Sequence, residues 1–377
     1  MSATARPAHL DAAAIAALSD RVRAEVDRGH SHAAQFALGY QGEIVATGSF
    51  GNATVDTRFV IFSATKTIVA MALLPLLADG RIELTAPVAR HIPEFAGNGK
   101  QHVTVLQLLT MQGGFPQCNV SPERFSSSAG RRADFAEWPL AWAPGTRTEY
   151  HPIAAHWVIG ELIENATGRP FTDVVHDTVV APYGVPRLLG FAAPPTDVAT
   201  IRVAGEVPAD RARLVEVFGR ADLVPDTTVT PDGLLMLNLP IVQQAGVPGG
   251  GGVARAADIA AVYQSFLHNT ACILPPDWLR DATSVIRNGS INTSDGTPAN
   301  RTIAAVIAGD DAYREHRWFP ASPRAFGHHG AGGQLCWADP TSGLSLCFLH
   351  DTLQQNPAHD FLRSREINAL ALACANH

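Results

Sequence analysis

Residues 63–78 read SATKTIVAMALLPLLA, and this stretch decides how the rest of the chain is interpreted. Apolar side chains recur in it at helical spacing and Asp79-Gly80 follows it, so the pattern predicts one helix over 63–78. Ser63 and Lys66 then share a face of the first turn, because residues three apart are neighbours on a helix. Pro75 has no backbone N–H and predicts a bend late in the helix that leaves the first turn intact.

The first turn of a helix is a favourable place for a serine nucleophile. Its free backbone N–H groups and the positive end of the helix dipole favour an alkoxide on Ser63. The same field, together with burial, disfavours an ammonium ion on Lys66, so the amine can serve as a base. Lys66 is also one of two lysines in the chain, the other being Lys100. The alternative is a serine N-cap followed by an ordinary lysine, which Ser-x-x-Lys alone does not exclude.

A second segment, PGTRTEYHP at residues 144–152, presents a tyrosine just before a predicted helix. Pro152 suits the first turn of that helix, which is expected to run to about Thr167 and to end at Gly168. Tyr150 is therefore expected at a helix entrance, where it can take part in proton transfer. The alternative is a tyrosine that serves only in packing.

A third segment, GHHGAGG at residues 327–333, precedes two apolar runs. The runs cover 334–338 and 344–349 and are separated by DPTSG, which predicts two strands joined by a turn. Glycines in front of a strand let a substrate approach the backbone closely.

Ser63-Ala64-Thr65-Lys66, Tyr150-His151-Pro152 and His328-His329-Gly330 together resemble the motifs of the serine β-lactamase and penicillin-binding-protein superfamily. The most similar branch contains class C β-lactamases and family VIII carboxylesterases, and the chain looks closest to the latter. That branch has Ser-x-x-Lys, Tyr-x-Asn, and Lys-Thr-Gly or His-x-Gly at these places. Three motifs in the right order are far more specific than one, and the resemblance covers about residues 55–350.

The resemblance implies a role for each motif. Ser63 is the nucleophile, and Lys66 and Tyr150 share the work of general base and general acid. The backbone N–H groups of Ser63 and Ala331 form the oxyanion hole, which stabilises the charge that develops in the transition state. The implied chemistry needs no metal and no organic cofactor.

Two departures from the family pattern bear on the class of substrate. Pro152 replaces the asparagine that lactamases of this branch use near the substrate amide, and losing that partner weakens recognition of an amide. His328 stands where lactamases carry a lysine that faces the substrate carboxylate, and a histidine is mostly neutral at pH 7. Both changes favour uncharged esters over β-lactams. Gly330 lies in the same motif beside the substrate, and Gln117 and Trp142 are further candidates for substrate contact.

No metal site is predicted from the histidines and cysteines. His151 and His329 adjoin the motifs and are interpreted as supporting residues, since no Asp, Glu or Cys spacing accompanies them. The five cysteines are odd in number and lack metal-ligand spacing. Cys336 and Cys347 fall on consecutive predicted strands and are expected in the core.

Composition indicates a globular protein with no nucleic-acid partner. The chain has 377 residues, 46% of them hydrophobic, a formal net charge of −7 and no basic cluster. Its apolar stretches are too short to cross a membrane, so no membrane association is expected. The N-terminus lacks a basic region followed by an apolar run, which leads us to expect a cytoplasmic protein.

The two ends of the chain are expected to form one unit. A helix over 11–26 and a hairpin over 35–48 mirror the C-terminal strands and a helix over 360–374. The predicted fold is α+β and β-lactamase/transpeptidase-like, with an antiparallel sheet flanked by helices and an inserted, mainly helical domain. The expected domains are 1–65 with 246–377, and 66–245, and the Gly-rich run 247–252 is expected to be a transition between them.

These observations lead to the hypothesis of a serine carboxylesterase that hydrolyses short- to medium-chain esters of small molecules. The alternatives are a β-lactamase or D-amino-acid peptide hydrolase, an acyltransferase that uses the same acyl-enzyme, and a binding protein without catalysis. The nucleophile-elbow motif Gly-x-Ser-x-Gly is missing, so an α/β-hydrolase is not supported. The loops over 115–145 and 195–247 are expected to set specificity, and the sequence leaves the oligomeric state open.

Overall fold

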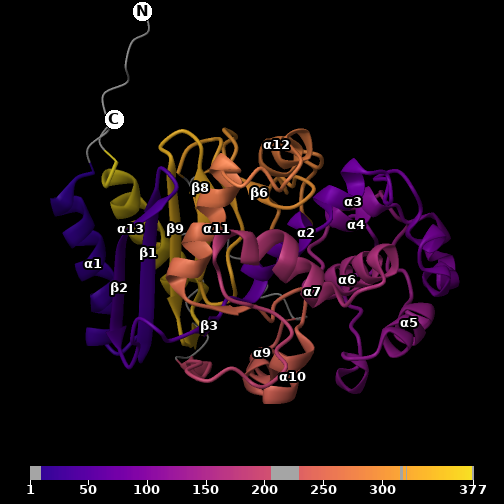
Figure 1. The fold of residues 1–377 in the computed structure, drawn as a ribbon, viewed down its shortest axis with the longest axis horizontal. Coiled ribbons are helices and arrows are strands. Elements are labelled where there is room, and N and C mark those ends of the chain that lie inside the picture. Colours follow the sequence, from indigo (N-terminus) through magenta and orange to yellow (C-terminus); the bar gives the residue numbers. More distant parts are fainter. Residues whose placement is uncertain (1–9, 205–228, 315–316, 320, 376–377) are drawn as a thin grey trace, which may run out of the picture.

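A six-stranded antiparallel sheet is the main layer of the protein, which a computed structural model describes for residues 10–204, 229–314, 317–319 and 321–375 (Figure 1). N-terminal and C-terminal segments meet in this sheet, and the predicted α+β fold is confirmed. Part of the predicted specificity loop over 195–247 lies outside the described residues. The strands, in the order in which they lie side by side, are β2 Glu43–Gly51, β1 Ala33–Tyr40, β9 Leu344–His350, β8 Leu335–Asp339, β7 Phe326–Gly327 and β6 Val306–Ile307.

Two short strand pairs lie outside the main sheet. One joins β3 (Phe59–Val60) to β5 (Val253–Ala254) in front of the Ser63 segment, and the other joins β4 (Arg202–Ala204) to β10 (Thr352–Gln354). The first pair brings the run that ends at Gly252 against the residues that precede Ser63. The predicted domain division at 65/66 and 245/246 stays a prediction.

Helices cover both faces of the sheet. α1 (Ala12–Asp27) and α13 (Pro357–Ala373) lie side by side on one face, and α11 (Ala256–His268) packs on the other (Figure 1). The other helices are α2 Thr65–Met71, α3 Leu74–Ala78, α4 Val105–Leu109, α5 Ser128–Glu137, α6 Ala154–Thr167, α7 Phe171–Val175, α9 Pro231–Leu235, α10 Pro240–Ala245 and α12 Pro276–Ser284. None of the helices within the described ranges combines the length and the apolar composition needed to cross a membrane.

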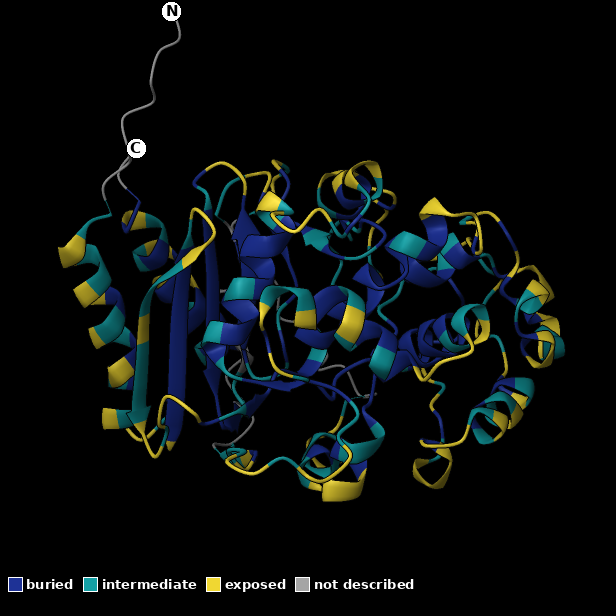
Figure 2. Ribbon diagram, viewed as in Figure 1, coloured by how far each residue is buried: buried dark blue, intermediate teal, exposed yellow. Residues whose placement is uncertain are grey.

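The central strands are buried on both faces, as Figure 2 shows for β1, β8 and β9. Successive side chains of a strand point to opposite faces. In β9, Phe348 therefore packs with the α1 and α13 side, whereas Cys347 packs with the α11 side. Cys336 of β8 lies opposite Cys347, with 3.6 Å between the two sulfur atoms, and both are free and buried, as predicted.

The predicted single helix over 63–78 is wrong in its extent. Ser63 lies in a 3₁₀ turn, Phe62–Ala64, and α2 and α3 follow it as separate helices. The chain breaks between them at Ala72 and Leu73, because Pro75 fits only the first turn of a new helix. The predicted bend near Pro75 is thus confirmed, and α2 remains intact behind Ser63.

The helix after Tyr150 also begins later than predicted. α6 starts at Ala154, so Pro152 precedes the helix instead of lying in its first turn. Its end is confirmed, since Gly168 has a left-handed conformation with φ of 68°. Tyr150 therefore lies on a short connection in front of α6, and other contacts must hold it in place.

Candidate active site

Ser63, Lys66 and Tyr150 come together at the start of α2. The Ser63 Oγ atom lies 3.0 Å from Lys66 Nζ and 2.8 Å from Tyr150 Oη. Lys66 Nζ also lies 5.1 Å from the centre of the Tyr150 ring. Ser63 is partly exposed, whereas Lys66 is buried. Ser63 Oγ thus has two groups within hydrogen-bond distance that could accept its proton.

The turn that carries Ser63 has an unusual backbone. Phe62 has φ of 46°, a left-handed conformation that is rare for a bulky residue and needs support from its surroundings. The Ile61 N–H donates to Gly252 O at 2.8 Å, and the Gly252 N–H donates to Thr65 Oγ1 at 2.9 Å. The glycine-rich run therefore holds both sides of this turn.

Gly249 fixes the orientation of Lys66 and was missed by the sequence interpretation. Lys66 Nζ donates to Gly249 O at 2.5 Å, in addition to its contact with Ser63. A Cβ at Gly249 would lie 3.1 Å from Pro152 O, so the two segments are in close contact. Glycines 249–252 lie in the run that is expected to be a transition between domains, which stays a prediction, and they also pack against the segments that carry Ser63 and Tyr150. The signal was present, since a run of four glycines permits close backbone approach.

His151 holds the connection that carries Tyr150. Its Nε2 accepts the Phe115 N–H at 3.1 Å, and its Nδ1 lies 2.7 Å from Glu149 O. A carbonyl oxygen can only accept, so Nδ1 carries the proton and the ring is neutral. Burial lowers the pKa of His151 to about 4. Both ring nitrogens are engaged, so the structure gives His151 a supporting position.

Gly330 brings the third motif against the Ser63 turn. A Cβ at Gly330 would lie 2.6 Å from Ile61 O, so no larger residue fits without displacement. Among the described residues, no hydrogen-bond partner accepts from the N–H groups of Ser63 and Ala331. The assignment of these two N–H groups to an oxyanion hole stays a prediction.

His328 lies beside Tyr150 as a neutral ring. The two ring centres are 6.0 Å apart, and His328 Nδ1 lies 2.7 Å from His329 O. Burial and the charge of Arg301 lower the pKa of His328 well below its usual value, so this position carries no positive charge at neutral pH. Its Nε2 is buried without a hydrogen-bond partner among the described residues. His329 instead stacks on Trp318, with 4.7 Å between the ring centres.

Arg301 is a second residue that the sequence interpretation missed. Its guanidinium carbon lies 5.3 Å from the centre of the Tyr150 ring. Tyr150 is thus flanked by Lys66, His328 and Arg301. No motif surrounds Arg301, so no local pattern in the sequence could have identified it.

Gln117 and Trp142 are the remaining residues predicted to contact substrate. Gln117 is exposed, and no hydrogen bond joins it to Ser63, Lys66 or Tyr150 among the described residues. Trp142 is partly buried, with its ring 6.1 Å from that of His151. Both remain predictions as substrate contacts.

Comparison with known proteins agrees with this geometry. A family model described as Beta-lactamase matches residues 18–371. Esterase/beta-lactamase LipL of Mycobacterium tuberculosis is 24% identical over 315 residues, which cover 80% of this chain and 70% of LipL. Esterase EstB of Burkholderia gladioli is 34% identical over 212 residues, which cover 49% of this chain and 53% of EstB. The crystal structure of a family VIII carboxylesterase has the same fold, with a TM-score of 0.73 and 24% identity over 96% of this chain and 99% of that one. The family model spans the sheet, the helical part and all three motifs, and the chain belongs to the β-lactamase family.

Proposed function

We propose that the protein is a serine carboxylesterase that hydrolyses short- to medium-chain esters through an acyl-enzyme on Ser63. The observation that carries the proposal is the placement of Ser63 Oγ within 3.0 Å of Lys66 Nζ and 2.8 Å of Tyr150 Oη. Two relatives named as esterases support the choice of substrate class.

The proposed reaction has two similar halves. Ser63 Oγ attacks the ester carbonyl carbon while its proton passes to Lys66 or Tyr150. The oxyanion that forms accepts hydrogen bonds from the backbone N–H groups of Ser63 and Ala331. The tetrahedral intermediate collapses, the same proton passes to the leaving alcohol, and the acyl group stays on Ser63. Water then attacks the acyl-enzyme and gives up a proton to the same pair, the bond between the acyl carbon and Ser63 Oγ breaks, and the proton returns to Ser63 Oγ as the acid leaves. All atoms come from the ester and one water molecule.

The test compares p-nitrophenyl acetate, butyrate and octanoate with a chromogenic cephalosporin. Ser63→Ala and Lys66→Ala are expected to lower ester turnover by about 1,000-fold or more, and Tyr150→Phe by about 100-fold. Ser284→Ala and Tyr313→Phe are matched controls, because both residues are exposed. Labelling by a serine-reactive phosphonate, abolished in Ser63→Ala and kept in the two control variants, identifies the nucleophile directly. Unchanged ester turnover in Ser63→Ala would refute the mechanism.

A β-lactamase is the second candidate, since LipL is named both an esterase and a β-lactamase. Cephalosporin turnover that exceeds ester turnover and depends on Ser63 would move the assignment to it. Transfer of the acyl group to an added alcohol in preference to water would instead indicate an acyltransferase. Pro152 in place of the family asparagine makes the β-lactamase the less expected outcome.

A further inference from the structure

Glu25, His30 and His359 bring three possible metal ligands together where α1 meets α13. Glu25 lies in α1, His30 follows the end of α1, and His359 lies in the first turn of α13, which packs beside α1 (Figure 1). Glu25 Oε2 lies 3.6 Å from His30 Nδ1 and 3.6 Å from His359 Nε2. All three side chains offer a ligand atom within 4.8 Å of the other two. No local spacing in the sequence indicates this group, because its members come from the two ends of the chain.

The two histidine nitrogens that face Glu25 are otherwise unused. Both are buried and have no hydrogen-bond partner among the described residues. A separation of 3.6 Å from the carboxylate oxygen is too long for a hydrogen bond. Buried polar atoms normally have a partner, which can be an ion that the protein binds. A cation between the three atoms gives each of them a partner at once.

The spacing of the three atoms suits a small divalent cation. In zinc sites the metal lies about 2.1 Å from a histidine nitrogen or a carboxylate oxygen, so two ligands of a tetrahedral site are about 3.4 Å apart. The two separations of 3.6 Å are close to this value. Imidazole and carboxylate are also ligands that Zn²⁺ accepts together.

Two arginines contact the same carboxylate but leave it able to bind a cation. Arg21 Nη1 contacts the other oxygen, Glu25 Oε1, at 2.6 Å, and Arg363 Nη1 lies 3.4 Å from Oε2. Each arginine has a closer carboxylate partner of its own, since Arg21 lies 2.5 Å from Glu366 and Arg363 lies 2.8 Å from Asp360. The two guanidinium groups therefore face three carboxylates.

The ligand atoms are held in place before any metal binds. The His30 N–H donates to Glu25 O at 2.9 Å, and His30 O accepts from Gln354 Nε2 at 2.7 Å. The His359 N–H donates to Asn356 Oδ1, which caps α13, at 3.2 Å. A surface pocket of about 290 Å³ opens beside both histidines, so water can reach the ions and groups between them. Arg28 lines the same pocket but is exposed, and solvent screens its charge.

We propose that Glu25, His30 and His359 bind one Zn²⁺ ion, with water from the pocket as the fourth ligand. The proposal goes beyond the esterase function and does not depend on it. Because the three ligands are far apart in the unfolded chain, the ion binds the folded state and ties α1 to α13.

Calorimetry at pH 8 tests the site, with the full chain first freed of metal by EDTA and then dialysed. Ordinary histidines are neutral at this pH and can bind a metal. We expect one equivalent of Zn²⁺ to bind with a Kd of about 1 µM. His30→Ala and His359→Ala are each expected to weaken binding by about 100-fold or more, and Glu25→Gln by a similar factor. Co²⁺, whose visible spectrum reports its ligand geometry, should give a four-coordinate spectrum with the native protein and not with these variants.

His32→Ala and His268→Ala are the matched controls, because both histidines are exposed and lie outside the group of three. Their Kd values are expected to stay within about twofold of that of the native protein. At a Zn²⁺ concentration 100 times the Kd, the native protein and both controls should unfold about 3 °C higher than in EDTA, whereas the three ligand variants should not shift.

Unfolding transitions in EDTA show that each variant is folded. The two histidine side chains are 35% and 25% exposed, so their alanine variants decide the test even if Glu25→Gln does not fold. A native Kd weaker than about 10 µM, weakening of less than tenfold in either histidine variant, or equal weakening in a control would overturn the proposal. These measurements need no ester, so they stand whether or not the proposed esterase reaction is confirmed.

Discussion

At the scale of single residues, the position of Ser63, the proposed nucleophile, depends on a contact that only glycine allows. Gly330 touches the carbonyl of Ile61, two residues before Ser63, and an added methyl group would lie 2.6 Å from that oxygen. We predict that Gly330→Ala moves the Ser63 turn and lowers kcat/KM for esters about 100-fold, because small displacements at a reacting atom have large effects on rate. Ester kinetics measure kcat/KM, and a circular dichroism spectrum shows whether the variant is folded.

Gly289→Ala is the matched control for Gly330→Ala. The nearest atom to an added Cβ there is Ile286 Cγ2, at 3.7 Å, which is an ordinary contact. Its kcat/KM should stay within about twofold of wild type, in line with the small effects of most surface substitutions. Normal activity in a folded Gly330→Ala protein would show that the turn tolerates the displacement.

At the scale of elements, turns and helix ends could be predicted from the residues that form them. Contacts between segments that lie far apart in the sequence could not. The hairpin of β1 and β2 follows from Gln41-Gly42, which both have positive φ, and the end of α6 follows from Gly168. The contact between Ser63 and Lys66 was also predictable, because residues three apart lie on the same face of a helical turn. Lys66 and Gly249, in contrast, are 183 residues apart, and only the folded chain brings them together. The 3₁₀ turn at Phe62 likewise exists because distant segments support a conformation that its own sequence disfavours.

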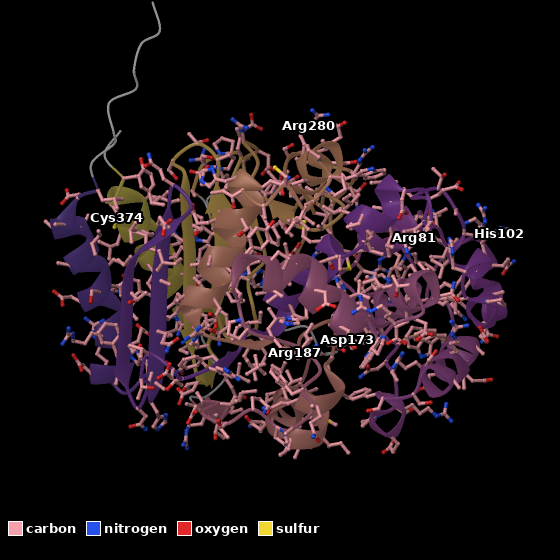
Figure 3. All side chains as sticks on the ribbon, viewed as in Figure 1. Arg81, His102, Asp173, Arg187, Arg280 and Cys374 are labelled. Carbon is pink, nitrogen blue, oxygen red and sulfur yellow. The ribbon has the colours of Figure 1, made fainter. Side chains whose placement is uncertain are left out.

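The connection in front of α6 gives a prediction at the same scale. His151→Leu removes the acceptor for the Phe115 N–H and the donor to Glu149 O, leaving two backbone groups without partners. We expect the free energy of unfolding to fall by about 3 kcal/mol, and kcat to fall because Tyr150 is no longer held. His151→Gln retains a donor and an acceptor, so its free energy of unfolding and its kcat should fall less than those of His151→Leu. His102→Leu is the control, because His102 is exposed at the far end of the helical part (Figure 3). An equal loss in both leucine variants would contradict this role.

At the scale of the whole molecule, one buried carboxylate joins the two ends of the chain. Glu25 of α1 lies 2.6 Å from Arg21 and 3.4 Å from Arg363 of α13. Burial would raise the pKa of Glu25, but the contact with His359 and the charges of Arg363 and Arg21 hold that pKa well below its usual value. Because the pKa is lowered, the stabilisation is present above the unfolded-state pKa of about 4.3 and is lost as pH falls below it.

We therefore predict that Glu25→Gln lowers the free energy of unfolding by about 3 kcal/mol at pH 7, since a buried charge loses its partner. The difference from wild type should shrink below about pH 4, as urea unfolding can measure. Glu366→Gln is the control, because Glu366 pairs with Arg21 but is 60% exposed, and it should change stability by less than about 1 kcal/mol. Equal effects of the two substitutions would show that Glu25 does not join the helices.

Buried histidines make the stability of the whole molecule depend on pH in a second range. Burial lowers the pKa of His151 to about 4 and those of His329 and His350 to about 3, and two further histidines, 156 and 328, shift the same way. Histidines in the unfolded chain take up protons below about pH 6.5, whereas these rings stay neutral in the fold, so acid favours unfolding. Burial raises the pKa of Asp360 to about 7 and also raises that of Glu164, so these two groups favour the folded state in acid, but they are fewer than the histidines.

We expect the free energy of unfolding to fall from pH 6.5 to 5, by up to about 1.4 kcal/mol per pH unit for each histidine that these acids do not offset. In His151→Gln the slope should be shallower by about one proton, and an unchanged slope would show that His151 is already protonated in the folded protein.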